Sequence, residues 1–70
     1  MDKHFPKKIG KKIVLFRQRK KVSQEQLSLR CGIDRTQLYR VEKGITNPTL
    51  KTAKKIALGL GIKLFTLIKN

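Results

Sequence analysis

The stretch "LRCGIDRTQLYR", residues 29–40, contains the break that decides the fold. An apolar pattern with helical spacing stops at Gly32 and starts again directly afterwards. Glycine readily adopts the left-handed conformation that closes a helix, and Asp34 is a residue type that caps the start of the next one. We therefore predict two helices joined by a tight turn, over residues 24–31 and 35–43.

Helical periodicity continues on both sides of this turn. Ile9, Ile13 and Phe16 fall on one side of a helix that starts near Pro6. Ser23, with a glutamine three residues later, has the pattern of a capping box for the second helix. No strand is needed anywhere. The predicted helices cover residues 7–20, 24–31, 35–43 and 50–60, with one final helical turn within 62–69.

The chain is short and strongly basic. Its 70 residues are enough for one domain, residues 1–70, of which we expect 1–5 to be flexible. Eighteen Lys and Arg oppose four acids, which gives a formal net charge of +14. Such a surface attracts polyanions, and nucleic acid is the usual one. One cysteine, Cys31, and one histidine, His4, exclude a disulfide framework and a structural zinc site, so we expect no metal and no cofactor.

The apolar runs are too short for a membrane segment. The longest purely apolar run is "IVLF", residues 13–16, so neither a transmembrane helix nor the core of a signal peptide is expected. The first helix is basic with one apolar side, which would also suit a membrane surface. In so small a domain the core needs that side, however, so we expect a cytoplasmic protein that does not bind membranes.

Two short helices joined by a glycine-containing turn form the helix-turn-helix signature, in which the second helix enters the major groove of DNA. Four polar residues of this second helix lie within about 100° of one another on a helical wheel, opposite the apolar Leu38 and Val41. Arginine can pair with guanine O6 and N7, which is worth about 1–3 kcal/mol of discrimination, and a threonine methyl can meet a thymine methyl. The four residues are Thr36, Tyr39, Arg40 and Lys43.

Over residues 9–68 the chain resembles the lambda-repressor-like (Xre, phage repressor) helix-turn-helix family. The resemblance implies an all-α, compact five-helix DNA-binding domain, with the helix-turn-helix at helices two and three, whose partner is double-stranded DNA. Four sequence blocks in the right order carry it: "SQEQL" at 23–27, "CGIDRTQLYRVEKG" at 31–44, "TNPTL" at 46–50 and "IALGLGI" at 56–62.

The resemblance also implies a role for individual positions. Gln24 matches a glutamine that lies against a DNA phosphate and braces the recognition helix, and Arg17 matches an arginine that pairs with a glutamate at the position of Glu42. The expected base-reading residues are Arg35, Thr36, Gln37, Tyr39 and Arg40, with Gln37 at the border of the set. The expected phosphate-binding residues are Ser23, Gln24, Lys43, Thr46 and Asn47.

Departures from the family pattern concentrate near the C-terminus. Lys63 stands where relatives often carry a capping serine or aspartate, and Gly59 lies inside a helix at a cost of about 0.5–1 kcal/mol. Leu58 and Phe65 point away from the apolar stripes of their helices. Scattered surface apolar residues are ordinary, but a pair near one end favours a subunit interface. We therefore expect a homodimer that binds a palindromic operator, with half-sites about 34 Å apart.

Several functions remain open at this point. Small members of the family include phage repressors, antitoxins of toxin–antitoxin pairs, which would need a second surface for a toxin partner, and controllers of restriction–modification systems. "DRT" followed by "NPTLK" most resembles the controllers. A non-specific nucleic-acid binder would rely on charge alone, like the lysines at positions 7–12, and few aromatics are available for stacking. An enzyme is not expected, because one His, one Cys and four dispersed acids offer no catalytic arrangement.

Overall fold

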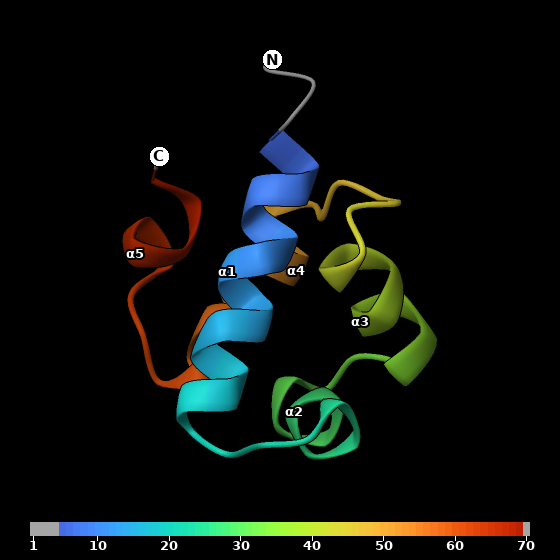
Figure 1. Ribbon diagram of the computed structural model, residues 1–70, viewed down its shortest axis with the longest axis vertical. Helices are drawn as coiled ribbons and strands as arrows, with labels where there is room; N and C mark the ends of the chain where they lie inside the picture. Colours follow the sequence, from blue (N-terminus) through green and yellow to red (C-terminus); the bar gives the residue numbers. More distant parts are fainter. Residues whose placement is uncertain (1–4, 70) are drawn as a thin grey trace.

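The computed structural model describes residues 5–69 and consists of five helices, with no strand among these residues (Figure 1). The predicted all-α fold is therefore confirmed. Residues 1–4 of the segment expected to be flexible lie outside the described residues, and the first helix already begins at position 5. The helices are α1 (Phe5–Arg19), α2 (Gln24–Cys31), α3 (Arg35–Glu42), α4 (Leu50–Leu60) and α5 (Leu64–Ile68).

Local signals set the ends of α2. The Ser23 hydroxyl accepts from the Gln26 N–H at 3.0 Å, and the Gln26 side-chain carbonyl accepts from the Ser23 N–H at 2.9 Å, which completes the predicted capping box. At the other end Gly32 has φ +68°, the left-handed conformation that glycine favours. The Ile33 N–H then donates to the Ser28 carbonyl at 3.1 Å. The turn between α2 and α3 is thus fixed by its own sequence.

Two N-cap positions make no side-chain capping bond within residues 5–69. Asp34 occupies the N-cap of α3, but no backbone N–H of this helix donates to its carboxylate in the part of the chain that the structure describes, so the predicted cap is wrong in this respect. Lys63, at the N-cap of α5, also makes no cap bond there. Both helices form because they bury apolar side chains, Leu38 and Val41 in α3 and Leu67 in α5.

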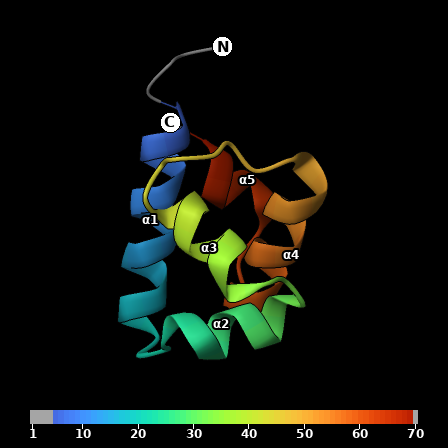
Figure 2. The ribbon, with the colours of Figure 1, turned by 90° about the vertical axis from the view of Figure 1, so that its right-hand side faces the viewer.

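One apolar core connects all five helices. Figure 2 shows α3 at the front of the molecule, with α2 below it and α4 beside it. Ile33, in the turn, is partly buried against this core. The largest fully buried side chains are Ile13, Leu27, Leu38, Val41, Ile56, Leu60 and Leu67.

Two helix-interior glycines allow neighbouring helices to approach closely. A Cβ at Gly10 would lie 2.5 Å from the carbonyl oxygens of Val41 and Glu42, and a Cβ at Gly59 would lie 2.5 Å from the Cys31 sulfur. Real Cβ atoms do not sit so close, so a side chain at either position would force its neighbour to shift. The apparent departure at Gly59 therefore has a packing reason, and α1 and α4 lie hard against the helix-turn-helix unit.

Candidate nucleic-acid interface

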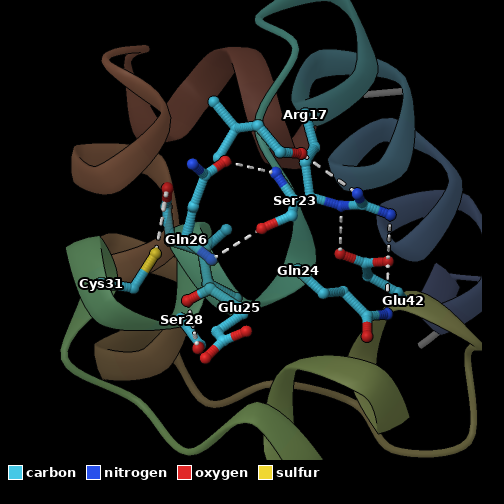
Figure 3. Close-up of polar contacts among 10 residues, drawn as sticks. Arg17, Ser23, Gln24, Glu25, Gln26, Ser28, Cys31 and Glu42 are labelled. Atoms are coloured by element: carbon cyan, nitrogen blue, oxygen red, sulfur yellow. Dashed lines mark hydrogen bonds and ion pairs between the residues drawn. The ribbon is translucent and has the colours of Figure 1, made fainter.

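A buried carboxylate at the end of α3 links this helix to α1 and α2 (Figure 3). Glu42, at the end of α3, is 7 % exposed. It accepts from Arg17 Nε at 2.9 Å and from Arg17 Nη2 at 3.1 Å, and from Gln24 Nε2 at 3.0 Å. Arg17 Nη1 also donates to the Val22 carbonyl at 3.1 Å. We call Arg17, Gln24 and Glu42 the carboxylate hub.

The carboxylate hub determines how α3 sits relative to α1 and α2. A bidentate arginine–carboxylate pair has a defined geometry, so it sets orientation as well as distance. Gln24 is the first residue of α2 and is half-buried, and one of its amide hydrogens is taken by Glu42. Gln24 is thus bonded to α3, the helix that the resemblance expects it to brace.

The opposite side of α3 presents polar and cationic side chains to solvent. The Tyr39 side chain is 45 % exposed, and the Lys43 ammonium lies 5.7 Å from the centre of its ring. Glu42 of α3 is buried and paired with Arg17, whereas Asp34, at the N-cap of α3, is exposed. We call the exposed side the recognition face: Arg35, Thr36, Gln37, Tyr39 and Arg40, all of them exposed.

Two hollows flank Thr36 and bring the predicted residues together. The first is a shallow hollow lined by Gln24, Arg35, Thr36 and Tyr39. The second is a cleft between α3 and the start of α4, whose lining includes Thr36, Gln37, Arg40, Thr46, Asn47, Thr49 and Thr52. Base-reading and phosphate-binding candidates thus share both surfaces. Ser23 and Lys43 are exposed outside these hollows, and the Ser23 hydroxyl already accepts the capping bond.

Sequence reasoning missed Thr52. This residue is 8 % exposed, lines the cleft, and accepts a hydrogen bond from Gln37 Nε2 at 3.4 Å. Its distance of 15 positions from Gln37 gives no local signal. The sequence did predict Thr49 as the N-cap of the fourth helix. A capping side chain accepts from the N–H of the third residue after it, which is Thr52, and this was the one hint that Thr52 lies near the start of that helix.

The lysines of α1 do not form one equivalent group. Lys7, Lys8 and Lys11 are exposed, whereas Lys12 is half-buried and its ammonium donates to the Lys69 carbonyl at the end of α5. A Cβ at Gly44 would lie 2.8 Å from Lys7 Cγ, so Lys7 packs against the turn that follows α3. The chain's basic N-terminal half therefore includes a lysine next to the recognition helix.

The predicted interface residues are both highly exposed. Leu58 is 81 % exposed on α4 and Phe65 is 69 % exposed on α5, where the Lys69 ammonium lies 5.9 Å from the Phe65 ring centre. Figures 1 and 2 place α5 on the side of the molecule opposite α3. None of the helices between residues 5 and 69 is long and apolar enough to cross a bilayer.

With this geometry established, comparison with known proteins identifies the fold family. The family described as Helix-turn-helix matches residues 13–67. The chain belongs to the helix-turn-helix family. This membership covers both hollows and the carboxylate hub, and it places the chain in a class of DNA-binding domains.

Curated relatives in the family are named as regulators. The chain is 41 % identical over 54 residues to a protein of Neisseria meningitidis named Neisseria hypothetical transcription factor, covering 77 % of this chain and 51 % of that protein. It is 37 % identical over 57 residues to the HTH-type transcriptional regulator SlrR of Bacillus subtilis, covering 80 % and 38 % respectively. The chain thus spans about half, or less, of the length of these two relatives.

Solved structures of the family superpose closely. The restriction-modification controller protein C.AhdI from Aeromonas hydrophila has a TM-score of 0.86 and 34 % identity, with 89 % of this chain and 94 % of that chain covered. The hypothetical transcription factor NHTF from Neisseria has a TM-score of 0.87 and 33 % identity, with 97 % of this chain and 79 % of that chain covered. The controller is therefore similar to this chain in length as well as in fold.

Proposed function

We propose that this protein is a transcriptional regulator that binds double-stranded DNA at specific sequences, with α3 in the major groove. The observation that carries the proposal is the two-sided character of α3. Its C-terminal end is held by the carboxylate hub, whereas Arg35, Thr36, Tyr39 and Arg40 project away from the core without acids among them. A rigid helix with exposed arginines suits base reading, because contacts to base edges need fixed geometry.

Phosphate contacts would set the position of α3 in the groove. Gln24 and Arg35 share one hollow, and Thr46 and Asn47 share the other with Arg40. We propose that Ser23, Gln24, Lys43, Thr46 and Asn47 hold the DNA backbone while the recognition face chooses the sequence. The net charge of +14 would add a general attraction that depends on salt.

The protein is proposed to act as a homodimer on a palindromic operator. Leu58 and Phe65 support this proposal because they are large, apolar and highly exposed, and because α5, which carries Phe65, lies on the side of the molecule opposite α3. A two-fold dimer presents two copies of α3 to half-sites about 34 Å apart. Sedimentation equilibrium of the wild type and Phe65→Asp tests this interface. The same dimer dissociation constant for both proteins would show that Phe65 is not part of it.

The circuit that we propose is control of a restriction–modification system, in the cytoplasm of the cell that carries it. The likeness to C.AhdI, which extends over 94 % of that chain, favours this circuit. Footprinting on DNA upstream of the genes next to the one that encodes this chain tests it. Protection upstream of a methyltransferase or endonuclease gene supports the proposal, and protection only upstream of a toxin or phage gene contradicts it.

Sequence-specific binding is tested by selecting sites from a randomised duplex library and measuring mobility shifts on selected and scrambled duplexes. Arg35→Ala and Arg40→Ala are expected to weaken binding to the selected duplex about tenfold while changing the scrambled one much less. The control Lys11→Ala, an exposed lysine of α1, should weaken both alike and lower the salt slope by about 1. Equal losses on both duplexes for the arginine variants would remove their base-reading role.

A further inference from the structure

The Gln37 side chain, unlike the other residues of the recognition face, is bonded to α4. Its Nε2 donates to the Thr52 hydroxyl at 3.4 Å, across the cleft that separates α3 from the start of α4. Gln37 itself is exposed, while Thr52 is 8 % exposed and belongs to the buried side of α4. The amide is therefore held at one end by a group that the core keeps in place.

The Thr52 hydroxyl is in turn fixed by Thr49. Thr49 Oγ1 accepts from the Thr52 N–H at 3.1 Å as the cap of α4, and it donates its own hydrogen to Thr52 Oγ1, also at 3.1 Å. Thr52 Oγ1 consequently acts as an acceptor at this position. In the structure the NH2 end of the Gln37 amide, and not its carbonyl end, faces this oxygen.

This orientation determines what the rest of the amide can bind. One amide hydrogen is used by Thr52, which leaves the Gln37 Oε1 and a second N–H for the open cleft. Adenine presents an N6 donor next to an N7 acceptor in the major groove, whereas guanine presents two acceptors, O6 and N7. An amide fixed with its carbonyl outward matches adenine and meets guanine O6 with a second acceptor.

We propose that Thr52 is a positioning residue that orients the Gln37 amide to read adenine. The inference rests on the proposed function and names the base recognised at one position of each half-site. Gln37 Oε1 accepts from adenine N6, and the free Nε2 hydrogen donates to N7. Thr52 touches no DNA; its bond to Gln37 Nε2 favours the amide orientation that matches adenine over the rotated one that accommodates guanine.

The first test is site selection from a randomised duplex library with the wild type, Gln37→Ala, Thr52→Val and Thr52→Ser. The wild type is expected to prefer adenine at one half-site position by about tenfold or more. Thr52→Val removes the hydroxyl with little change in shape, and it should reduce this preference below about threefold at that position alone, as should Gln37→Ala. Thr52→Ser keeps the hydroxyl and should therefore retain the preference for adenine.

Thr66→Val serves as the matched control, because it makes the same chemical change on α5, away from the cleft. It should leave every base preference unchanged. Circular dichroism during thermal unfolding verifies that each variant is folded at the binding temperature. A loss of the adenine preference in Thr66→Val as well would attribute the effect to general loosening and overturn the role of Thr52.

The second test changes single atoms of the DNA. Replacing the selected adenine by 7-deazaadenine removes N7, and replacing it by unsubstituted purine removes the N6 amino group. Both replacements should weaken wild-type binding, and both should have little effect on Gln37→Ala and Thr52→Val. Sensitivity to the amino group alone, or selection of cytosine at that position, would contradict the two-point contact with adenine.

The outcomes separate this inference from the proposed function. If the wild type enriches no sequence at all, the proposed function is wrong. If it enriches an operator and Thr52→Val or Gln37→Ala enriches the same operator with the same preferences, the Gln37–Thr52 bond only joins two helices, and the inference is overturned while the proposed function stands.

Discussion

Two glycine junctions hold the helix-turn-helix unit, and they differ in what the glycine meets. Gly10 lets α1 approach the backbone carbonyls of Val41 and Glu42, whereas Gly59 lets α4 approach the Cys31 side chain. A backbone inside a helix cannot retreat without breaking hydrogen bonds, but a side chain can be shortened. We therefore expect that no second substitution can compensate for a side chain at Gly10. A side chain at Gly59 should be compensated by a smaller residue at position 31.

The carboxylate hub makes the first junction polar as well as tight, and its removal should have the largest effect. Glu42→Ala leaves the Arg17 guanidinium, whose side chain is only 17 % exposed, without its partner. Breaking a buried pair in this way costs about 3–5 kcal/mol of unfolding free energy. Urea denaturation measures the loss. A change under about 1 kcal/mol would show that water replaces the pair readily and that the hub does not fix α3.

Gly10→Ala comes next. Its Cβ would overlap two carbonyl oxygens at 2.5 Å, so α1 and α3 must separate, at a cost of about 3 kcal/mol. Because α3 moves, binding to the selected duplex should fall as well. Urea denaturation and mobility shift measure the two effects. An alanine here that raises stability, as it does at most helix-interior glycines, would contradict the close approach.

Gly59→Ala should have a smaller effect that a second substitution repairs. The Cβ would lie 2.5 Å from the Cys31 sulfur, and overpacking of this kind costs about 1–3 kcal/mol. Replacing Cys31 by alanine in the same chain removes that sulfur, so the double variant should be more stable than Gly59→Ala alone. A double-mutant cycle on unfolding free energies measures the coupling, and strictly additive effects would count against the contact.

Asp34→Ala should have the smallest effect. The Asp34 carboxylate receives no capping bond from α3, so its loss should change the unfolding free energy by less than about 0.5 kcal/mol. Thr49→Ala is the matched control, because Thr49 does cap α4, and it should cost about 1 kcal/mol. Equal losses in the two variants would mean that Asp34 caps its helix in solution.

The parts of the fold that could be predicted are those with local signals. The bounds of α2 and α4 follow from the residues that cap them, Ser23 with Gln26, and Thr49, and from the glycines at their ends. The start of α1 was predicted two residues late, at 7 and not at Phe5, because Pro6 fits inside a first turn as well as just before one.

Other features depend on which helix lies opposite, and sequence patterns do not contain that information. The sequence alone indicates that Gly59 destabilises its helix, because its packing against Cys31 appears only in the three-dimensional structure. The Asp34 prediction failed because a residue type favours a cap without dictating its side-chain rotamer. Gln37 was placed at the border of the base-reading set, and no sequence pattern indicated its bond to Thr52, 15 positions away.

The division of α3 into a held side and a free side has a consequence for engineering. Leu38, Val41 and Glu42 carry the attachments to the rest of the molecule, so a grafted recognition helix must keep all three. The intervening positions contribute almost nothing to the core and are open to randomisation. A library restricted to positions 35, 36, 37, 39 and 40 should yield folded proteins with redirected targets, whereas one that also varies 38, 41 and 42 should yield mostly insoluble ones.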